Sequence, residues 1–182
     1  MNQTETITYT ETLYAGRVVH LRLDTVTLPD GKESKREIIS HSGAVCIVAV
    51  TPERNVLFAR QFRLATGGTL LEIPAGKLEP EEDPAACAVR ELEEETGYRT
   101  GKIVPLFAAF ASPGYTTEKI YAFLATELTP SQTNFDEGEN IELVTIPLSE
   151  IETLLHSGGL TDMKSIAALY SALPLLQLSF PQ

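Results

Sequence analysis

The 182-residue chain has few of the features that would place it outside the cell or in a membrane. It has only two cysteines, Cys46 and Cys87, each inside an apolar stretch, which predicts buried thiols in a reducing compartment. No apolar run approaches the roughly 20 residues that a membrane span needs. Residues 1–12 also lack the basic-then-apolar pattern of a signal peptide. We therefore expect a cytoplasmic protein with no membrane partner.

Basic residues are also scarce, with 14 Lys and Arg against 25 Asp and Glu and a net charge of −11. This balance argues against sequence-independent binding of nucleic acid, which needs a basic surface. The acids gather between Glu72 and Glu95, where only Lys77 and Arg90 oppose them. Clustered acids attract divalent cations, and these cations then carry the positive charge that a phosphorylated substrate meets. The charge excludes a nucleic-acid partner but is compatible with a small phosphorylated substrate.

The usual enzyme nucleophiles are missing as well. The sequence has no GxSxG motif and no Cys–His arrangement that suggests covalent catalysis. Its three histidines, His20, His41 and His156, are scattered without metal-ligand spacing. Water is therefore the expected attacking group in any hydrolytic reaction.

Apolar periodicity predicts strands and helices that mix without regular βαβ alternation. The predicted strands are residues 18–28, 36–39, 44–50, 56–60, 103–111, 119–126 and 141–146. The predicted helices are residues 83–97, 149–155 and 162–174. Ser149 with Glu152 would form a capping box for the second helix, and Pro174 would interrupt the third. This pattern favours an α+β or α/β/α sandwich and not a Rossmann sheet.

The clearest predicted helix is bounded by good capping residues. Asp83 suits the N-cap, Pro84 suits the first helical position, and Gly97 suits the position just after the helix. One face of this helix is predicted to be apolar, formed by Ala85, Val89, Leu92 and Thr96.

The opposite face of this helix carries Glu91, Glu94 and Glu95 at i, i+3 and i+4. Like charges at this spacing destabilise a helix by a few tenths of a kcal/mol per pair. An acidic triplet by itself is most often a solvated surface. Three like charges on one face are explained if hard cations lie between the carboxylates, because Mg²⁺ prefers oxygen ligands and leaves room for phosphates.

The residues around the helix complete a long motif. Gly76 begins the turn before it, where a side chain would obstruct a backbone carbonyl that approaches a metal. Glu82 and Arg90 suit a supporting role, because arginine can hold a carboxylate with two hydrogen bonds. The matched positions are Gly76, Glu82, Arg90-Glu91-Leu92, Glu94-Glu95 and Gly97-Tyr98. They match the Nudix box, G-x5-E-x7-R-E-U-x-E-E-x-G-U with U a bulky apolar residue, at every defined position.

The chain therefore resembles the Nudix hydrolase superfamily. The resemblance implies an α+β fold, the Nudix α/β/α sandwich with a mixed central sheet and an N-terminal antiparallel β-sheet extension. It implies that residues 1–40 form this extension, which serves dimerisation and part of the substrate site, and that residues 41–182 form the hydrolase domain. Two or three Mg²⁺ ions are implied, with Mn²⁺ able to substitute. The implied ligands are the Ala75 carbonyl and the side chains of Glu91, Glu94 and Glu95.

Segments outside the box resemble the ADP-ribose pyrophosphatase and nucleoside diphosphate sugar hydrolase branch. These segments are residues 11–16, 35–37, 61–63, 72–76 and 111–114. Pro113 follows the end of the box at Tyr98 by 15 residues, the spacing associated with this branch. By this resemblance we expect Glu72, Ser112, Pro113 and Gly114 to contribute to substrate binding.

Three arginines are further candidates for substrate contacts. Arg36 and Arg63 suit the base or the diphosphate because a fork-shaped guanidinium matches planar and phosphate acceptors, although each could equally be a surface arginine at a strand end. Arg17 occupies a position where some relatives carry an aromatic residue that stacks on adenine from the partner subunit. Guanidinium stacking could replace that contact, but the departure weakens the expectation of strict adenine selectivity.

Residues 136–142 resemble the acidic catalytic loop of this branch. The resemblance makes Glu139 a further metal ligand and Glu137 the general base, with Glu94 as the alternative base. A mobile loop suits a base that meets its water only when substrate is bound.

The expected function is Mg²⁺-dependent hydrolysis of the diphosphate bond of nucleoside diphosphate sugars by a homodimer. ADP-ribose is the first candidate, and the products would be a nucleoside monophosphate and a sugar phosphate. One alternative is a dinucleoside-polyphosphate or nucleoside-triphosphate pyrophosphatase, since Tyr115 lies near the position of a tyrosine in the former. Another is a non-catalytic module that senses ADP-ribose, which the complete set of box glutamates disfavours.

Overall fold

The structure is a computed structural model that describes residues 3–134 and 140–179. The chain divides into two compact units. The first comprises Met1–Gly43 with Phe110–Lys119, and the second comprises Ala44–Ala109 with Ile120–Gln182. Each unit is described by itself.

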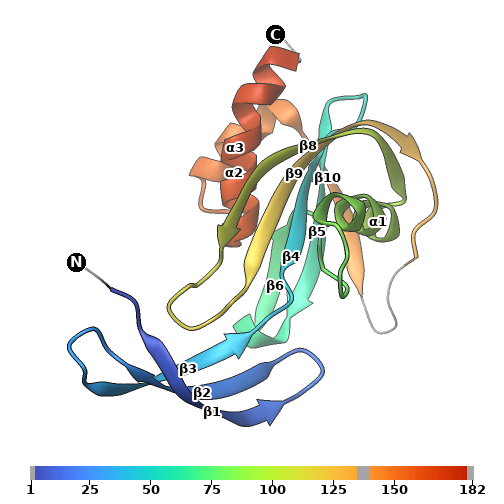
Figure 1. Ribbon diagram of the computed structural model, residues 1–182. Helices are drawn as coiled ribbons and strands as arrows, with labels where there is room; N and C mark the ends of the chain where they lie inside the picture. The colour runs from blue at the N-terminus through green and yellow to red at the C-terminus, as the bar shows by residue number, and fades with distance from the viewer. Residues whose placement is uncertain (1–2, 135–139, 180–182) are drawn as a thin grey trace. The chain divides into compact units, whose positions relative to one another are not determined.

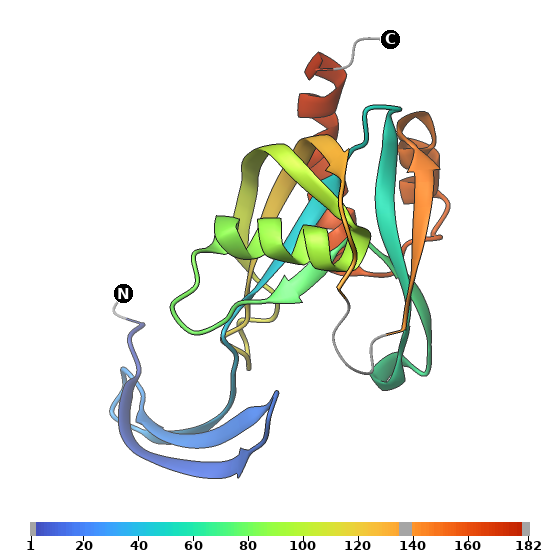
Figure 2. The same ribbon diagram turned by 90° about the vertical axis from the view of Figure 1, so that its right-hand side faces the viewer.

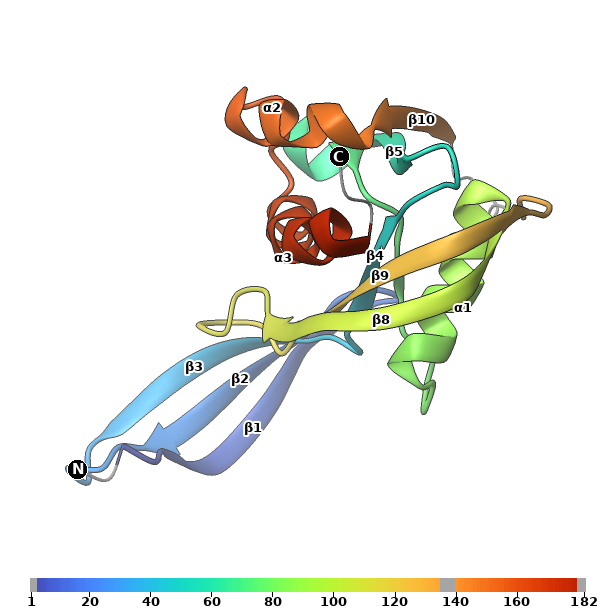
Figure 3. The same ribbon diagram turned by 90° about the horizontal axis from the view of Figure 1, so that it is seen from above.

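The first unit is built on a three-stranded antiparallel sheet, whose strands run side by side in Figure 3. Its strands in spatial order are β1 (Thr6–Ala15), β2 (His20–Thr27) and β3 (Glu33–Ser40). The β2–β3 hairpin was predicted, and its turn includes Gly31 with a φ of 84°. Strand β1 was not predicted. All ten of its residues are exposed, although the alternation of threonine with Ile7 and Tyr9 over residues 6–10 is a strand pattern that the prediction did not use.

The second unit contains two sheets (Figure 1). The four-stranded sheet has the order β7 (Ala75–Lys77), β4 (Ala44–Ala49), β9 (Lys119–Pro130), β8 (Tyr98–Phe110). It is mixed, because β4 is antiparallel to β7 and parallel to β9. The three-stranded sheet has the order β10 (Ile141–Pro147), β5 (Asn55–Arg63), β6 (Gly68–Glu72). The strands β6 and β7 were not predicted, because five and three residues are too short to show a period.

Helices cover both faces of the mixed sheet. Helix α1 (Pro84–Thr96) and helix α3 (Met163–Ser179) both pack on β4, and Figures 2 and 3 show them on opposite sides of it. The side chains that β4 shares with α1 form a buried cluster that includes Val45, Ile47, Ala88 and Leu92. A central strand buried on both faces was predicted for this segment, and five of the six residues of β4 are buried. None of the helices within the described ranges is long and apolar enough to span a membrane.

The boundaries of α1 follow the predicted caps. The Asp83 carboxylate accepts hydrogen bonds from the N–H groups of Ala85 and Ala86 at 3.0 and 3.1 Å. Gly97 ends the helix with a φ of 71°, the left-handed conformation that glycine adopts most easily.

The buried face of α1 differs from the prediction. It consists of Cys87, Ala88, Leu92, Glu95 and Thr96. Val89 is only partly buried, and Glu95, which was expected on the exposed face with Glu91 and Glu94, is buried instead. Glu95 is buried because it contacts the backbone of β7 at Ala75. The sheet therefore covers more of the helix surface than the apolar residues alone indicate.

Two predictions about the C-terminal helices were wrong. Residues 148–150 form a 3₁₀ turn ahead of α2 (Ile151–His156), so Ser149 lies inside that turn and makes no capping box with Glu152. Helix α3 also continues through Pro174 to Ser179. Proline removes one helical hydrogen bond. However, Pro174 is exposed, and the buried side chains of Ala172 and Leu176 hold the helix to the core on either side of it.

The cap of α1 gives a stability prediction. Asp83→Ala should lower the free energy of unfolding by about 1 kcal/mol, because it leaves two N–H groups of the first turn without their acceptor. Urea unfolding followed by circular dichroism measures the change. Glu53→Ala, the same loss of charge at an exposed turn position, is the matched control and should change stability by less than about 0.5 kcal/mol. Equal effects of the two substitutions would contradict the assigned cap.

Candidate active site

Gly76 is the point at which β7 and α1 approach most closely. A Cβ atom built at Gly76 would lie 1.8 Å from the Cδ atom of Glu91 and about as close to both carboxylate oxygens, at 2.1 and 2.2 Å. Only glycine therefore allows this carboxylate to lie against the backbone of the strand. The prediction that a side chain at Gly76 would obstruct the site agrees with this geometry.

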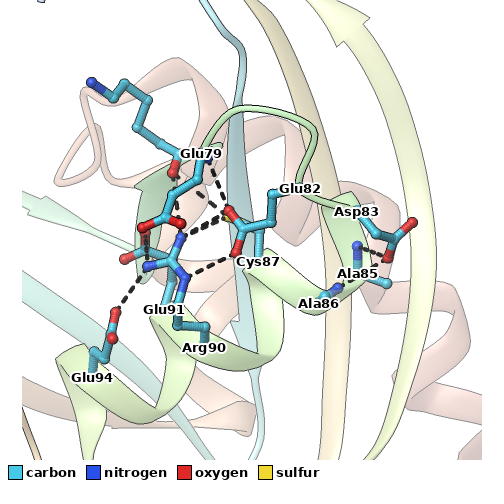
Figure 4. Close-up of polar contacts among 10 residues, drawn as sticks. Glu79, Glu82, Asp83, Ala85, Ala86, Cys87, Arg90, Glu91 and Glu94 are labelled. Atoms are coloured by element: carbon cyan, nitrogen blue, oxygen red, sulfur yellow. Dashed lines mark hydrogen bonds and ion pairs between the residues drawn. The ribbon is translucent and has the colours of Figure 1, made fainter.

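The guanidinium of Arg90 lies among three glutamates (Figure 4). Its Nε and Nη2 atoms donate to the two carboxylate oxygens of Glu82 at 2.9 and 3.0 Å. Its Nη1 atom donates to Glu91 at 2.8 Å and to Glu94 at 2.9 Å. The hydrogen bond from Arg90, with another from the backbone N–H of Glu79, lowers the pKa of Glu82 to about 2. Arg90 thus keeps Glu82 ionised and holds all three carboxylates in position.

Glu95 follows Glu91 by one helical turn, on the same side of α1, and contacts the backbone of β7. Its side chain is only 8% exposed, and its Oε2 atom accepts a hydrogen bond from the backbone N–H of Ala75 at 3.1 Å. Two consecutive residues of β7, Ala75 and Gly76, therefore contact two glutamates of α1, Glu95 and Glu91. The backbone of β7 and the glutamates of α1 therefore form one site.

The donor set suits a hard divalent cation, although the side chains are not arranged around a single point. Within residues 3–134 and 140–179, no three Asp, Glu, His or Cys side chains are grouped so that they could hold a metal ion. Glu91 and Glu94 turn to Arg90, whereas Glu95 turns to the Ala75 N–H. The carboxylates nevertheless offer only oxygen donors, which Mg²⁺ prefers, and the absence of a side chain at Gly76 lets the Glu91 carboxylate lie against β7. The predicted ligand Glu139 and the predicted base Glu137 lie outside the described residues.

A second charged cluster lies at the end of the neighbouring sheet. The Arg63 Nε and Nη2 atoms donate to the two carboxylate oxygens of Glu72 at 2.7 and 3.0 Å. Glu72 is buried at the end of β6, whereas the Arg63 side chain remains 43% exposed. A narrow recess with no room for a water molecule lies between this cluster and the acidic helix, and its lining residues are Ala59, Gln61, Arg63, Glu72, Ile73, Ala75 and Glu95.

The sequence did not indicate two further members of this cluster, Lys164 and Asp162. The Lys164 ammonium donates to Glu72 and also to Asp162, the latter at 2.9 Å. Burial alone would raise the pKa of Glu72, but the hydrogen bonds from Arg63 and Lys164 outweigh it and lower the pKa to about 2. Lys164 is 92 residues away from Glu72 in the chain, so no local pattern could connect them.

The remaining predicted substrate residues belong to the first unit. Arg36 pairs through Nε and Nη2 with the Glu5 carboxylate at 3.0 and 2.5 Å, and Arg17 is exposed. The carbonyl of Ser112 accepts hydrogen bonds from the N–H groups of Tyr115 and Thr116, at 3.2 and 3.1 Å. Pro113 and Gly114 are therefore the exposed residues of a tight turn.

Comparison with known proteins identifies the fold and the family. The NUDIX domain model matches residues 40–169, and the model of the nucleoside diphosphate sugar hydrolase N-terminal domain matches residues 5–39. A solved structure described as an ADP compounds hydrolase matches with a TM-score of 0.87 at 23% identity, covering 99% of this chain and 98% of that chain. This match confirms the predicted Nudix sandwich with its mixed sheet.

Two relatives are more similar to this chain in sequence than that solved structure is. The chain is 42% identical over 161 residues to an ADP-ribose pyrophosphatase of Bacillus subtilis (strain 168), with 87% of each chain covered. It is 34% identical over 156 residues to a GDP-mannose pyrophosphatase of Escherichia coli (strain K12), with 79% of this chain and 81% of the relative covered. The chain belongs to the Nudix family of hydrolases. Enzymes of this family generally use a divalent metal such as Mg²⁺.

The close approach at Gly76 gives a second prediction. Gly76→Ala should lower the free energy of unfolding by about 1–3 kcal/mol, because either Glu91 or β7 must move to admit the methyl group. Gly68→Ala is the matched control in the same unit, since a Cβ there meets nothing within 4 Å. Chemical denaturation of both variants measures the difference. A Gly76→Ala protein as stable as the control would show that the two elements are not in contact.

The lowered pKa of Glu72 gives a prediction about acid stability. A carboxylate whose pKa falls from 4.5 to about 2 on folding stabilises the native state above pH 4.5 and loses that contribution as the pH falls towards 2. Glu72→Gln should therefore be less stable than the wild type at pH 7, and the difference should shrink between pH 4.5 and the lowest pH at which the protein folds. Urea unfolding at a series of pH values measures it.

The control for this series is Glu142→Gln, because Glu142 pairs with Arg60 at the surface, where its side chain is 64% exposed. This substitution should change stability little at any pH. A Glu72→Gln deficit that is independent of pH would contradict the assigned pKa.

Proposed function

We propose that this protein hydrolyses the diphosphate bond of nucleoside diphosphate sugars with Mg²⁺, ADP-ribose being the first candidate. The products are a nucleoside monophosphate and a sugar phosphate. The observation that carries the proposal is the set of carboxylates that Arg90 and Gly76 hold on α1, because oxygen donors suit Mg²⁺, with the partly exposed guanidinium of Arg63 nearby to contact an anion. The names of the ADP-ribose and GDP-mannose pyrophosphatase relatives support the same substrate class.

In this proposal the metal ligands are the Ala75 carbonyl and the carboxylates of Glu91, Glu94, Glu95 and Glu139. Two or three Mg²⁺ ions bind there, and Mn²⁺ can substitute for them. When bound, such ions neutralise charge on a diphosphate and lower the pKa of a water molecule. Arg90 keeps Glu91 and Glu94 in place when the metal is absent, and Gly76 gives Glu91 its position.

The chain itself supplies the anion contact and the proton acceptor. Arg63 is held by Glu72 and directs its remaining N–H donors to the diphosphate. Glu137 accepts the proton of the attacking water, and Glu94 is the alternative acceptor. The water oxygen bonds to one phosphorus atom, and the bond from that phosphorus to the bridging oxygen breaks.

The first unit supplies the rest of the substrate site in this proposal. Arg36 contacts the base or the diphosphate, Arg17 stacks on the base, and the turn formed by Ser112, Pro113 and Gly114 also contributes to substrate binding. Residues 1–40 act as the extension and residues 41–182 as the hydrolase domain, in keeping with the family models that meet at residues 39 and 40. The protein acts in the cytoplasm, which is consistent with its two free buried cysteines.

We also infer a homodimer that pairs through the first unit. Every residue of β1 is exposed, including four large apolar side chains, namely Ile7, Tyr9, Leu13 and Tyr14, with exposed fractions from 48% to 62%. An exposed apolar patch on a strand favours association with another chain. Light scattering tests this directly, and a monomeric mass at micromolar concentration would contradict it.

The roles of the glutamates are tested by substitution. Glu95→Gln should lower kcat for ADP-ribose with Mg²⁺ by on the order of 100-fold or more, because it removes a charged metal ligand. Glu93→Gln is the control on the same helix, since Glu93 pairs with Arg99 and Ser131 away from the recess, and its kcat should stay within about 3-fold. Full turnover by Glu95→Gln would show that the ligand assignment is wrong.

Steady-state rates with ADP-ribose, GDP-mannose, ADP-glucose, diadenosine polyphosphates and dNTPs identify the substrate class. The proposal expects the highest kcat/KM with a nucleotide sugar. A preference for dNTPs or for diadenosine polyphosphates would replace it with another pyrophosphatase activity, whereas tight ADP-ribose binding without turnover would indicate a sensor. Glu137→Gln and Glu94→Gln, compared under single-turnover conditions, separate the two candidate bases.

A further inference from the structure

The first turn of α3 is fixed to the chain segment that leads into the acidic site. The Ser165 hydroxyl accepts a hydrogen bond from the Ile73 N–H at 2.9 Å, and Ser165 is completely buried. The Asp162 carboxylate in turn accepts hydrogen bonds from the N–H and the hydroxyl of Ser165. Ile73 follows Glu72 directly and lies two residues before Ala75. The C-terminal helix is therefore anchored beside both charged clusters.

Lys164 extends from this anchored turn to the Oε2 atom of Glu72, which also accepts a hydrogen bond from Arg63. Its ammonium bonds to Glu72 and Asp162, and its side chain is only 16% exposed. Burial alone would lower the pKa of Lys164, but the charges of Asp162 and Glu72 outweigh it and raise the pKa, so the ammonium stays protonated. Glu72 is thus shared between a buried ammonium and an exposed guanidinium.

The charges of this cluster balance only because of Lys164. Arg63 and Lys164 together neutralise Glu72 and Asp162. Without the ammonium, the two carboxylates would outnumber the single guanidinium, in a recess that Glu95 also lines. A diphosphate would then meet a net negative wall, and the positive charge of Arg63 would be fully offset by Glu72.

We propose that Lys164 is a positioning residue for diphosphate binding. By neutralising Glu72 from the buried side, it leaves the guanidinium of Arg63 both fixed in place and electrostatically available to the substrate. The inference rests on the proposed function in one respect, namely that the exposed guanidinium of Arg63 contacts the diphosphate. It assigns the beginning of α3, which lies outside the Nudix box, a part in substrate affinity.

The test compares Lys164→Met, which keeps the apolar stem but removes the charge, with Lys164→Arg, which restores a cation. Affinity for ADP-ribose is measured by calorimetry in EDTA, and KM and kcat are measured with Mg²⁺. Lys164→Met should weaken ADP-ribose binding and raise KM by about 10-fold or more, while kcat changes by less than about 3-fold. Lys164→Arg should return both to within about 3-fold of the wild type. Met163→Ala, at the exposed neighbouring position, is the control and should change neither.

A double substitution separates the electrostatic role from a merely structural one. If Lys164 acts by neutralising Glu72, adding Lys164→Met to Glu72→Gln should weaken ADP-ribose binding by less than about 3-fold, because the charge that needed neutralising is gone. Equal losses with and without Glu72→Gln would overturn the proposal. The same comparison decides the question if Lys164→Met alone does not fold, which circular dichroism reveals.

The remaining outcomes are also decisive. Unchanged ADP-ribose affinity in folded Lys164→Met, or a loss confined to kcat, would overturn the proposal. If the wild type binds ADP-ribose but does not hydrolyse it, the proposed function fails and the calorimetric comparison still decides the role of Lys164. If the wild type binds none of ADP-ribose, GDP-mannose and inorganic pyrophosphate, the proposal fails with it.

Discussion

The hydrogen bonds of the Arg90 guanidinium hold together three carboxylates that would otherwise repel one another. Glu91 and Glu94 lie one helical turn apart, and Glu82 approaches from the preceding loop. Like charges at such spacing destabilise a helix, and a single bidentate cation among them removes that cost. The contact between Gly76 and Glu91 depends on this arrangement, because a carboxylate that swung outward would leave the strand. Arg90 therefore fixes the position of the carboxylates on this face of α1.

A second cation, Lys164, compensates the charge of Glu72 in the other charged cluster. Lys164 is buried behind Glu72 and compensates it, whereas Arg63 stays exposed in front. The two clusters consequently differ in net character, since α1 presents carboxylates and β5 presents a guanidinium. In the proposed function, a diphosphate would meet the carboxylates of α1 through bound cations and the guanidinium of Arg63 directly.

The sequence predicted the features that local chemistry determines. The caps of α1 at Asp83 and Gly97 are local, and both were confirmed to the residue. Strand β1 was missed although residues 6–10 alternate polar and apolar side chains, and the burial of Glu95 was missed because it depends on the neighbouring β7. The ion pair between Lys164 and Glu72 joins residues far apart in the chain, so only the packed fold brings it about. The roles of the site residues remain predictions.

The measurement that tests the central claim most directly is a crystal structure with Mg²⁺ and a non-hydrolysable analogue of ADP-ribose. The claim is that α1 holds the cations and that Arg63 faces the diphosphate across one recess. The predicted result is electron density for Mg²⁺ at the carboxylates of Glu91 and Glu95, with a phosphate oxygen within hydrogen-bonding distance of Arg63. Metal bound away from α1, or a diphosphate that does not approach Arg63, would contradict the account.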